Sequence, residues 1–203
     1  MQKLDLHYSK ELQGSFSLKK LNFLFVFQVN CPGCFFYGFP VVNQLFHRYK
    51  NEISFLGLST AFEDFTLNTE DHTKLLLEQK EVVGETKKAL LQQGMSTYPQ
   101  ELDFPIAMDE KLNGSVDLSE TSEKICAINP NFSNWSSFDQ NALKEKVINY
   151  LKSLNEISMT FTTNQLRGTP SFIIFNDQYE VLSKWFGHKE PREIEELIGN
   201  HLK

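Results

Sequence analysis

Two cysteines separated by two residues, Cys31-Pro32-Gly33-Cys34, are the side chains best suited to chemistry in this sequence. A cysteine at the start of a helix meets unpaired backbone N–H groups and the positive end of the helix dipole, and both favour its thiolate. A thiolate attacks disulfides, and a second thiol one helical turn later resolves the mixed disulfide that forms. The pattern therefore predicts thiol–disulfide exchange, with Cys31 as the nucleophile and Cys34 as the resolving residue.

Two other uses of this cysteine pair are open. A structural zinc site needs four ligands, usually two such pairs or one pair plus spaced histidines. Here only Cys126 and five scattered histidines remain, so we expect no metal site. Alternatively, both cysteines are buried and inert, which is how we interpret Cys126. The strand–turn–helix pattern around Cys31 and Cys34 favours redox use.

The elements on either side of the pair can be predicted from hydrophobic spacing. Residues 22–29 form a nearly continuous run of aromatic and β-branched residues, typical of a strand buried on both faces. From Cys34 onward, apolar side chains recur at helical spacing: Phe35, Phe39, Val42, Phe46 and Tyr49. A second apolar run, residues 53–59, follows at the distance of a β–α–β unit, which predicts a parallel strand.

Further along the chain, residues 69–93 predict one or two helices, with Gly84 as a possible break. Residues 104–109 predict a brief strand, and the first twenty residues an edge hairpin or a loose lead-in. We expect residues 113–158 to be a largely helical insertion within a single domain of residues 1–203. Its first part, to about residue 124, and the stretch 129–137 are polar, whereas residues 138–154 have helical spacing with Ser137 or Asp139 as the N-cap.

The segment Gly168-Thr169-Pro170 follows this region and precedes an apolar strand, residues 171–175. Residues 180–185 are predicted to complete a hairpin with that strand, and a last amphipathic helix is predicted from Glu190 to Leu202. Folding as β–α–β followed by β–β–α would bring Thr169 and Pro170 beside the cysteine turn. The backbone of Thr169 would then pair with an extended substrate segment, as in strand addition.

Composition narrows the class of protein. With 203 residues, 40% apolar residues, 23% charged residues and a net charge of −6, the chain resembles an ordinary globular α/β protein without the clustered basic face that nucleic acids require. The longest apolar run is too short to span a membrane. Residues 1–8 lack the apolar segment of a secretory signal, which predicts a cytoplasmic protein, or a periplasmic or extracytoplasmic one if a leader was removed.

Taken together, these motifs resemble the thioredoxin superfamily, and most closely its TlpA-like disulfide reductases, over about residues 21–109 and 161–202. The segment Leu166-Arg167-Gly168-Thr169-Pro170 is also similar to the disulfide oxidase DsbA, which likewise carries a helical insertion. The resemblance implies a thioredoxin-like fold with a central mixed sheet flanked by helices. It also implies a cis peptide bond before Pro170, placed against the cysteines.

Four positions depart from the pattern of that family. Asn30 replaces the tryptophan that often precedes the cysteine pair, and Phe25 stands where thioredoxins hold a buried acid. Tyr37 stands where some TlpA-like reductases hold a glutamate, so proton transfer to and from Cys34 lacks its usual relay. The helix proline, Pro40, lies one residue later than usual.

The leading hypothesis is an enzyme that exchanges disulfides with protein substrates and a redox partner protein, without a cofactor. Pro32, Gly33, Thr169 and Pro170 would contact the substrate. The alternative is a thioredoxin-fold binding module in which the insertion recruits a partner and redox turnover is secondary. Peroxide reduction is disfavoured because the peroxiredoxin pattern Pro-x-x-x-Thr-x-x-Cys is absent around both cysteines.

Overall fold

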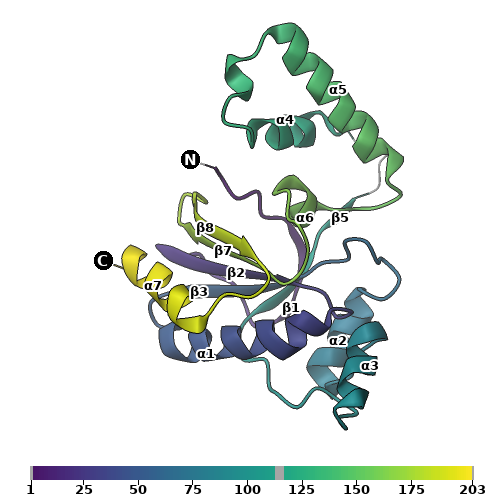
Figure 1. The fold of residues 1–203 in the computed structure, drawn as a ribbon, viewed down its shortest axis with the longest axis vertical. Helices are drawn as coiled ribbons and strands as arrows, with labels where there is room; N and C mark the ends of the chain where they lie inside the picture. Colours follow the sequence, from purple (N-terminus) through teal and green to yellow (C-terminus); the bar gives the residue numbers. More distant parts are fainter. Residues whose placement is uncertain (1, 113–116, 203) are drawn as a thin grey trace.

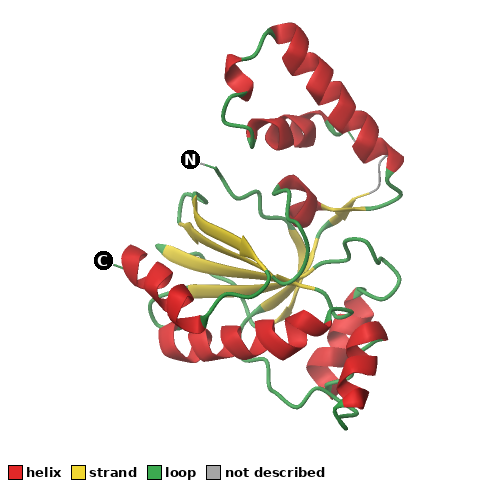
Figure 2. Cartoon of the chain, viewed as in Figure 1, coloured by secondary structure: helices red, strands yellow, loops and turns green. Residues whose placement is uncertain are grey.

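The computed structural model describes residues 2–112 and 117–202 and has a mixed β-sheet at its centre (Figures 1 and 2). The sheet has six strands in the order β1-β4-β3-β2-β7-β8. Their bounds are Tyr8–Gln13 for β1, Leu21–Phe27 for β2, Ser54–Ser59 for β3, Ile106–Asp109 for β4, Ser171–Asn176 for β7 and Val181–Phe186 for β8.

The strand pairing confirms the predicted topology around the cysteines. Strand β2 pairs in parallel with β3 and antiparallel with β7, and β7 forms an antiparallel hairpin with β8. Strand β4 continues the parallel part of the sheet beside β3. The N-terminal segment contributes a single edge strand, β1, antiparallel to β4, rather than a hairpin.

Strand β2 lies at the centre of two hydrophobic cores, as its uninterrupted apolar sequence predicted. Phe23, Phe25 and Phe27 face one core, and Leu24 and Val26 face the other, because successive side chains of a strand point to opposite faces. All seven residues of the strand are buried. Burial of each of these phenylalanines contributes about 1.5–3 kcal/mol, which fixes the strand that leads into the cysteine turn.

Helices cover both faces of the sheet (Figure 1). A π-helical segment, Cys34–Gly38, leads into α1, Phe39–Tyr49. Helix α1 packs with α7, Pro191–His201, on the face of the first core, whereas the short α6, Met159–Thr163, supplies Phe161 to the second core.

Helices α2, Glu70–Gln79, and α3, Gly84–Gln92, fill the region where one or two helices were predicted. Helix α2 ends at Lys80, which has a left-handed backbone with φ of 60°. Gly84, expected as a possible break, is instead the first residue of α3. The break falls earlier, over residues 80–83, where the chain leaves the helical conformation.

The region 113–158 contains two main helices, α4, Ser119–Ala127, and α5, Ser137–Ser153. Helix α4 was not predicted, because its stretch is mostly polar and shows no clear apolar face. The N-cap of α5 is Ser136, whose Oγ accepts a hydrogen bond from the Asp139 N–H at 3.1 Å, so the expected cap at Ser137 or Asp139 was wrong. Residues 113–116, at the start of the predicted insertion, lie outside the described residues.

A small core of its own holds this region together. Leu118, Leu151, Ile157 and Met159 are buried against one another. At its base, the short strands β5, Lys111–Leu112, and β6, Ile157–Ser158, pair antiparallel where the chain leaves and rejoins the sheet. Treating residues 113–158 as an insertion within one domain stays a prediction.

Candidate active site

Cys31 occupies the position that caps the start of the cysteine helix. Strand β2 ends at Phe27, and the helical backbone begins at Pro32 and Gly33. The N–H of Cys34 points back to Cys31, with 3.3 Å to its sulfur and 3.0 Å to its carbonyl oxygen. A helix N-terminus offers unpaired N–H groups and a positive dipole end, so this position favours a negative charge on the Cys31 sulfur.

The two thiols lie close together in different environments. Cys34 Sγ lies 2.7 Å from Cys31 Sγ, both cysteines are free, and Cys31 is partly exposed whereas Cys34 is fully buried. The hydrogen bond from Cys34 is the main cause that lowers the pKa of Cys31 from 9.0 to about 7, against the opposing effect of burial. Burial, followed by the hydrogen bond to Cys31, raises the pKa of Cys34 well above its usual range. Near neutral pH, Cys31 is therefore the thiol that ionises.

The loop before β7 closes over the cysteine pair. The Thr169–Pro170 peptide bond is cis, and the carbonyl oxygen of Thr169 lies 3.4 Å from Cys31 Sγ. An ideal Cβ placed on Gly33 would lie 3.6 Å from Cδ of Pro170, so these residues are in van der Waals range. The structure thus brings together residues from positions 31–34 and 169–170.

Gln28 is a residue of this site that the sequence reasoning missed. Its Oε1 accepts a hydrogen bond from the Thr169 hydroxyl at 2.9 Å, and its side-chain amide donates to the carbonyl of Phe62. Gln28 therefore fixes the loop that faces Cys31. The available signal was its polarity at the end of an apolar buried strand, because a polar side chain that is withdrawn from water there requires partners.

Asn30, immediately before Cys31, is anchored to the helices beside the sheet. Its Nδ2 donates to Asp64 at 2.8 Å, and its Oδ1 accepts from the Glu85 N–H at 2.7 Å, so it caps the first turn of α3. Its own N–H donates to Asn68 Oδ1 at 2.9 Å. Gly84 has φ of +54°, and a Cβ at that position would overlap the Asn30 side chain. Hydrogen bonds thus hold the residue that immediately precedes Cys31.

Phe25 and Gly38 fit together beneath the cysteine helix. The Phe25 ring stacks on Phe27 at 5.5 Å and on Phe172 at 5.2 Å. An ideal Cβ on Gly38 would lie 2.6 Å from the ring of Phe25, so only glycine fits at this position. Gly38 ends the π-helical segment, and Pro40 lies in the first turn of α1, where the missing N–H of a proline is tolerated.

Two tyrosines attach the cysteine helix to its surroundings. The Tyr37 hydroxyl hydrogen-bonds the backbone of Lys189, donating to its carbonyl and accepting from its N–H, and the ring lies 4.3 Å from that of His188. Tyr37 is therefore a link to the loop before α7. The Tyr98 hydroxyl donates to the Phe35 carbonyl at 3.2 Å, and burial raises the pKa of Tyr98.

The remaining chemical features lie apart from this site. Cys126 is buried on α4, and burial raises its pKa. Across residues 2–112 and 117–202, no group of three or more His, Cys, Asp or Glu side chains is arranged to hold a metal ion. Within the same residues, every helix is either too short or too polar to cross a membrane.

Comparison with known proteins identifies the fold. Neither a protein-family model nor a curated protein sequence matches the chain. Among solved structures, a thioredoxin-like superfamily protein is similar over 100% of this chain and 97% of its own, with a TM-score of 0.55 and 17% sequence identity. A thiol-disulfide isomerase from Corynebacterium glutamicum is similar over 99% of this chain and 96% of its own, with a TM-score of 0.58 and 18% identity. The chain therefore has the predicted thioredoxin-like fold.

Proposed function

We propose that the protein is a thiol–disulfide oxidoreductase that exchanges disulfides with protein substrates through Cys31 and Cys34. The observation that carries this proposal is the asymmetry of the pair. One thiol is partly exposed at a helix N-terminus with a pKa lowered to about 7, and the other is buried beside it with a raised pKa. An attacking thiol is most effective when its pKa lies near the ambient pH.

In the reducing direction, the Cys31 thiolate attacks one sulfur of a substrate disulfide. A mixed disulfide forms, and the other substrate sulfur leaves as a thiolate that takes up a proton. The negative charge of Cys31 is one cause of the raised pKa of Cys34, and the mixed disulfide removes that charge. Cys34 then loses its proton and attacks Cys31 Sγ, which releases the second substrate thiolate and leaves a Cys31–Cys34 disulfide. Two electrons pass to the substrate, and a redox partner protein restores the dithiol.

The same steps in reverse oxidise a substrate, so direction depends on the reduction potential. With a pKa of about 7, ionisation of Cys31 stabilises the reduced state at pH 7 by only about 0.4 kcal/mol, or about 9 mV. We therefore propose a potential between those of the strongest oxidants and the strongest reductants in this fold. The TlpA-like and DsbA-like resemblances both agree with a protein of this kind.

The loop before β7 supplies the contact for substrate backbone in this proposal. Within the described residues, the N–H groups of Arg167, Gly168 and Thr169 have no hydrogen-bond acceptor. Pro32, together with Gly33 and Pro170, which lie in van der Waals range of each other, would supply the remaining substrate contacts. An extended substrate segment that pairs with this loop would bring its disulfide to Cys31.

Single-cysteine variants test the proposal, with Cys126→Ala as the matched control. Cys31→Ala is expected to abolish exchange with a model disulfide-bonded protein, and Cys34→Ala to accumulate mixed disulfides visible on non-reducing gels. Cys126→Ala is expected to turn over like the unmodified protein. If the unmodified protein turns over neither dithiols nor disulfides, the proposal is wrong and the role of a binding module, with the insertion as the recruiting surface, takes its place.

A further inference from the structure

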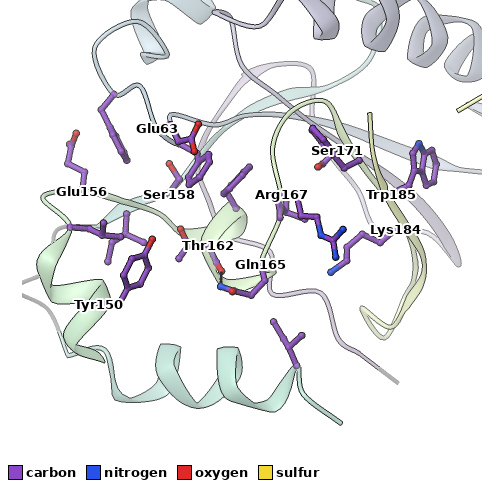
Figure 3. A pocket seen from close by; sticks show the side chains of 18 residues that line it. Glu63, Tyr150, Glu156, Ser158, Thr162, Gln165, Arg167, Ser171, Lys184 and Trp185 are labelled. Carbon is purple, nitrogen blue, oxygen red and sulfur yellow. Dashed lines mark hydrogen bonds between the residues drawn. The ribbon is translucent and has the colours of Figure 1, made fainter. Parts of the chain in front are cut away.

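A cleft of about 1070 Å³ opens between the sheet and the helical region that follows β4 (Figure 3). Its walls come from the loop after β3, the end of α5, α6, and strand β8. Aromatic and aliphatic side chains form much of the lining, including Phe62, Phe65, Leu154, Phe161 and Trp185. The volume lies just above the range for small-molecule pockets, about 300–1,000 Å³. A site of this size and lining suits a segment of polypeptide.

The cleft begins beside the loop that faces the nucleophilic sulfur. Arg167 and Ser171, on either side of the Gly168-Thr169-Pro170 segment, both line it. Phe186 lines it as well and packs on Gly168, since an ideal Cβ there would lie 2.8 Å from the ring of Phe186. A peptide whose reactive cysteine meets Cys31 would therefore place its neighbouring residues in this cleft.

Two positive charges stand at this end of the cleft. Figure 3 shows the side chains of Arg167 and Lys184 next to each other, with Glu156 on the far side of the view. In the part of the chain that the structure describes, neither cation lies within 4.0 Å of a carboxylate. The Lys184 ammonium donates only to neutral oxygens, the carbonyl of Asn164 at 3.2 Å and Oε1 of Gln2 at 3.4 Å.

The two carboxylates that line the cleft do not neutralise Arg167 and Lys184. Glu156 is 3.7 Å from the ammonium of Lys111, and Glu63 lies on the loop after β3. Burial, together with the nearby charge of Arg167, lowers the pKa of Lys184. A bound anion would relieve that unfavourable proximity, because an opposite charge favours the charged form of a lysine.

We propose that this cleft binds an extended segment of the substrate protein in which acidic side chains flank the reactive cysteine. The acidic side chains would lie beside Arg167 and Lys184, and apolar side chains further along the segment would lie against Phe62, Phe65 and Leu154. This inference rests on the proposed disulfide exchange and adds a substrate class to it. Charge complementarity of this type chiefly raises the association rate and the specificity.

The test compares peptides that share one disulfide and differ only in two residues beside the reactive cysteine. Glu, Gln and Lys at those positions give an acidic, a neutral and a basic peptide. We expect kcat/KM to be about five- to tenfold higher for the acidic than for the neutral peptide at low salt, and lowest for the basic one. At about 1 M salt, where the Debye length is about 3 Å, the difference is expected to disappear.

Charge variants assign the preference to the cleft. Arg167→Gln and Lys184→Gln are each expected to lower the acidic-to-neutral ratio, and Arg167→Glu with Lys184→Glu to favour the basic peptide. Arg192→Gln is the matched control, because it removes one positive charge from an exposed site on α7 that is ion-paired with Glu196 at 3.4 Å. That variant is expected to keep the ratio of the unmodified protein.

Reduction of hydroxyethyl disulfide, a small neutral substrate, separates the two possible failures. If the unmodified protein reduces it but treats the three peptides alike, or if the Arg167 and Lys184 variants keep the ratio, the inference is wrong and the proposed function stands. If the unmodified protein does not exchange with hydroxyethyl disulfide or any peptide, the proposed function is wrong and the inference falls with it.

Discussion

Replacing Cys34 by alanine or by serine tests how the structure activates Cys31. The Cys34 thiol, 2.7 Å from Cys31 Sγ, is the largest cause of the lowered pKa of Cys31. Cys34→Ala removes this donor, whereas Cys34→Ser keeps a hydroxyl in its place. We therefore expect the pKa of Cys31 to rise from about 7 towards 9.0 in the alanine variant, and to rise less in the serine variant.

The expected size of the effect follows from the two pKa values. At pH 7, a thiol of pKa about 7 is about half ionised, whereas one of pKa 9.0 is about 1% ionised, a difference of about fiftyfold. Intrinsic nucleophilicity falls with pKa with a Brønsted coefficient of about 0.4–0.5, which offsets about six- to tenfold of this difference. Cys31 should therefore react with a small neutral disulfide faster than in the alanine variant, by at most about five- to eightfold if the pKa of that variant reaches 9.0.

The assay is the ultraviolet absorbance of the thiolate as a function of pH, combined with the rate of the first exchange step in rapid mixing. The Cys126→Ala background removes the third thiol, which is buried and has a raised pKa. The reasoning is refuted if Cys34→Ala titrates at the same pH as the protein with Cys34 intact. In that case the helix N-terminus and Thr169, rather than Cys34, would set the ionisation of Cys31.

Two further predictions concern stability. Gly38→Ala is expected to lower the free energy of unfolding by about 1–3 kcal/mol because its Cβ would meet Phe25 at 2.6 Å. In denaturant titrations, adding Phe25→Leu to Gly38→Ala should recover part of this loss. If the losses of unfolding free energy in the two single variants simply add in the double variant, the explanation is contradicted. His7 has a pKa raised above 6.5, chiefly by its contact with the Asp5 carboxylate at 2.9 Å, so the stability from this pair is present below pH 6.5 and is lost as pH rises through the raised pKa. Over that pH range, the melting temperature of the unmodified protein should fall relative to that of His7→Gln, by an amount equivalent to at most about 1 kcal/mol. If the melting temperatures of the two proteins change with pH in parallel, the assignment to His7 is refuted.

Much of the fold could be predicted because its signals are local. The uninterrupted apolar run of β2 and the helical spacing after Cys34 are patterns among residues that are close in sequence and belong to the same strand or helix. Helix α4 escaped prediction because few of its residues are apolar, and it is held by contacts with α5 and by the buried Leu118. The π-helical segment after Cys34 could not be predicted either. It has only five residues, too few for their apolar spacing to differ from that of the α-helix that follows.

The candidate site could be predicted only in part, because its contacts join distant parts of the chain. The two cysteines are separated by only two residues, so their role follows from one motif. The hydrogen bond between Gln28 and Thr169 joins residues 141 positions apart, and that from the Cys31 thiol to the Thr169 carbonyl spans 138. The topology predicted that the two segments meet. It did not predict that Gln28 would hold the loop, since hydrogen-bond partners depend on side-chain positions that the strand order leaves open.

Two side chains beside the cysteine turn keep their positions because a glycine lies against each of them. Phe25 fits beneath the cysteine helix only because residue 38 has no side chain, and the aromatic stack there follows from that pair. Asn30 caps α3 only because residue 84 is glycine, so hydrogen bonds fix the loop before Cys31. Both contacts are local, and both leave Cys31 at the start of its helix, facing Thr169. The geometry at Cys31 therefore depends on two contacting pairs, Phe25 with Gly38 and Asn30 with Gly84, rather than on either member of a pair alone.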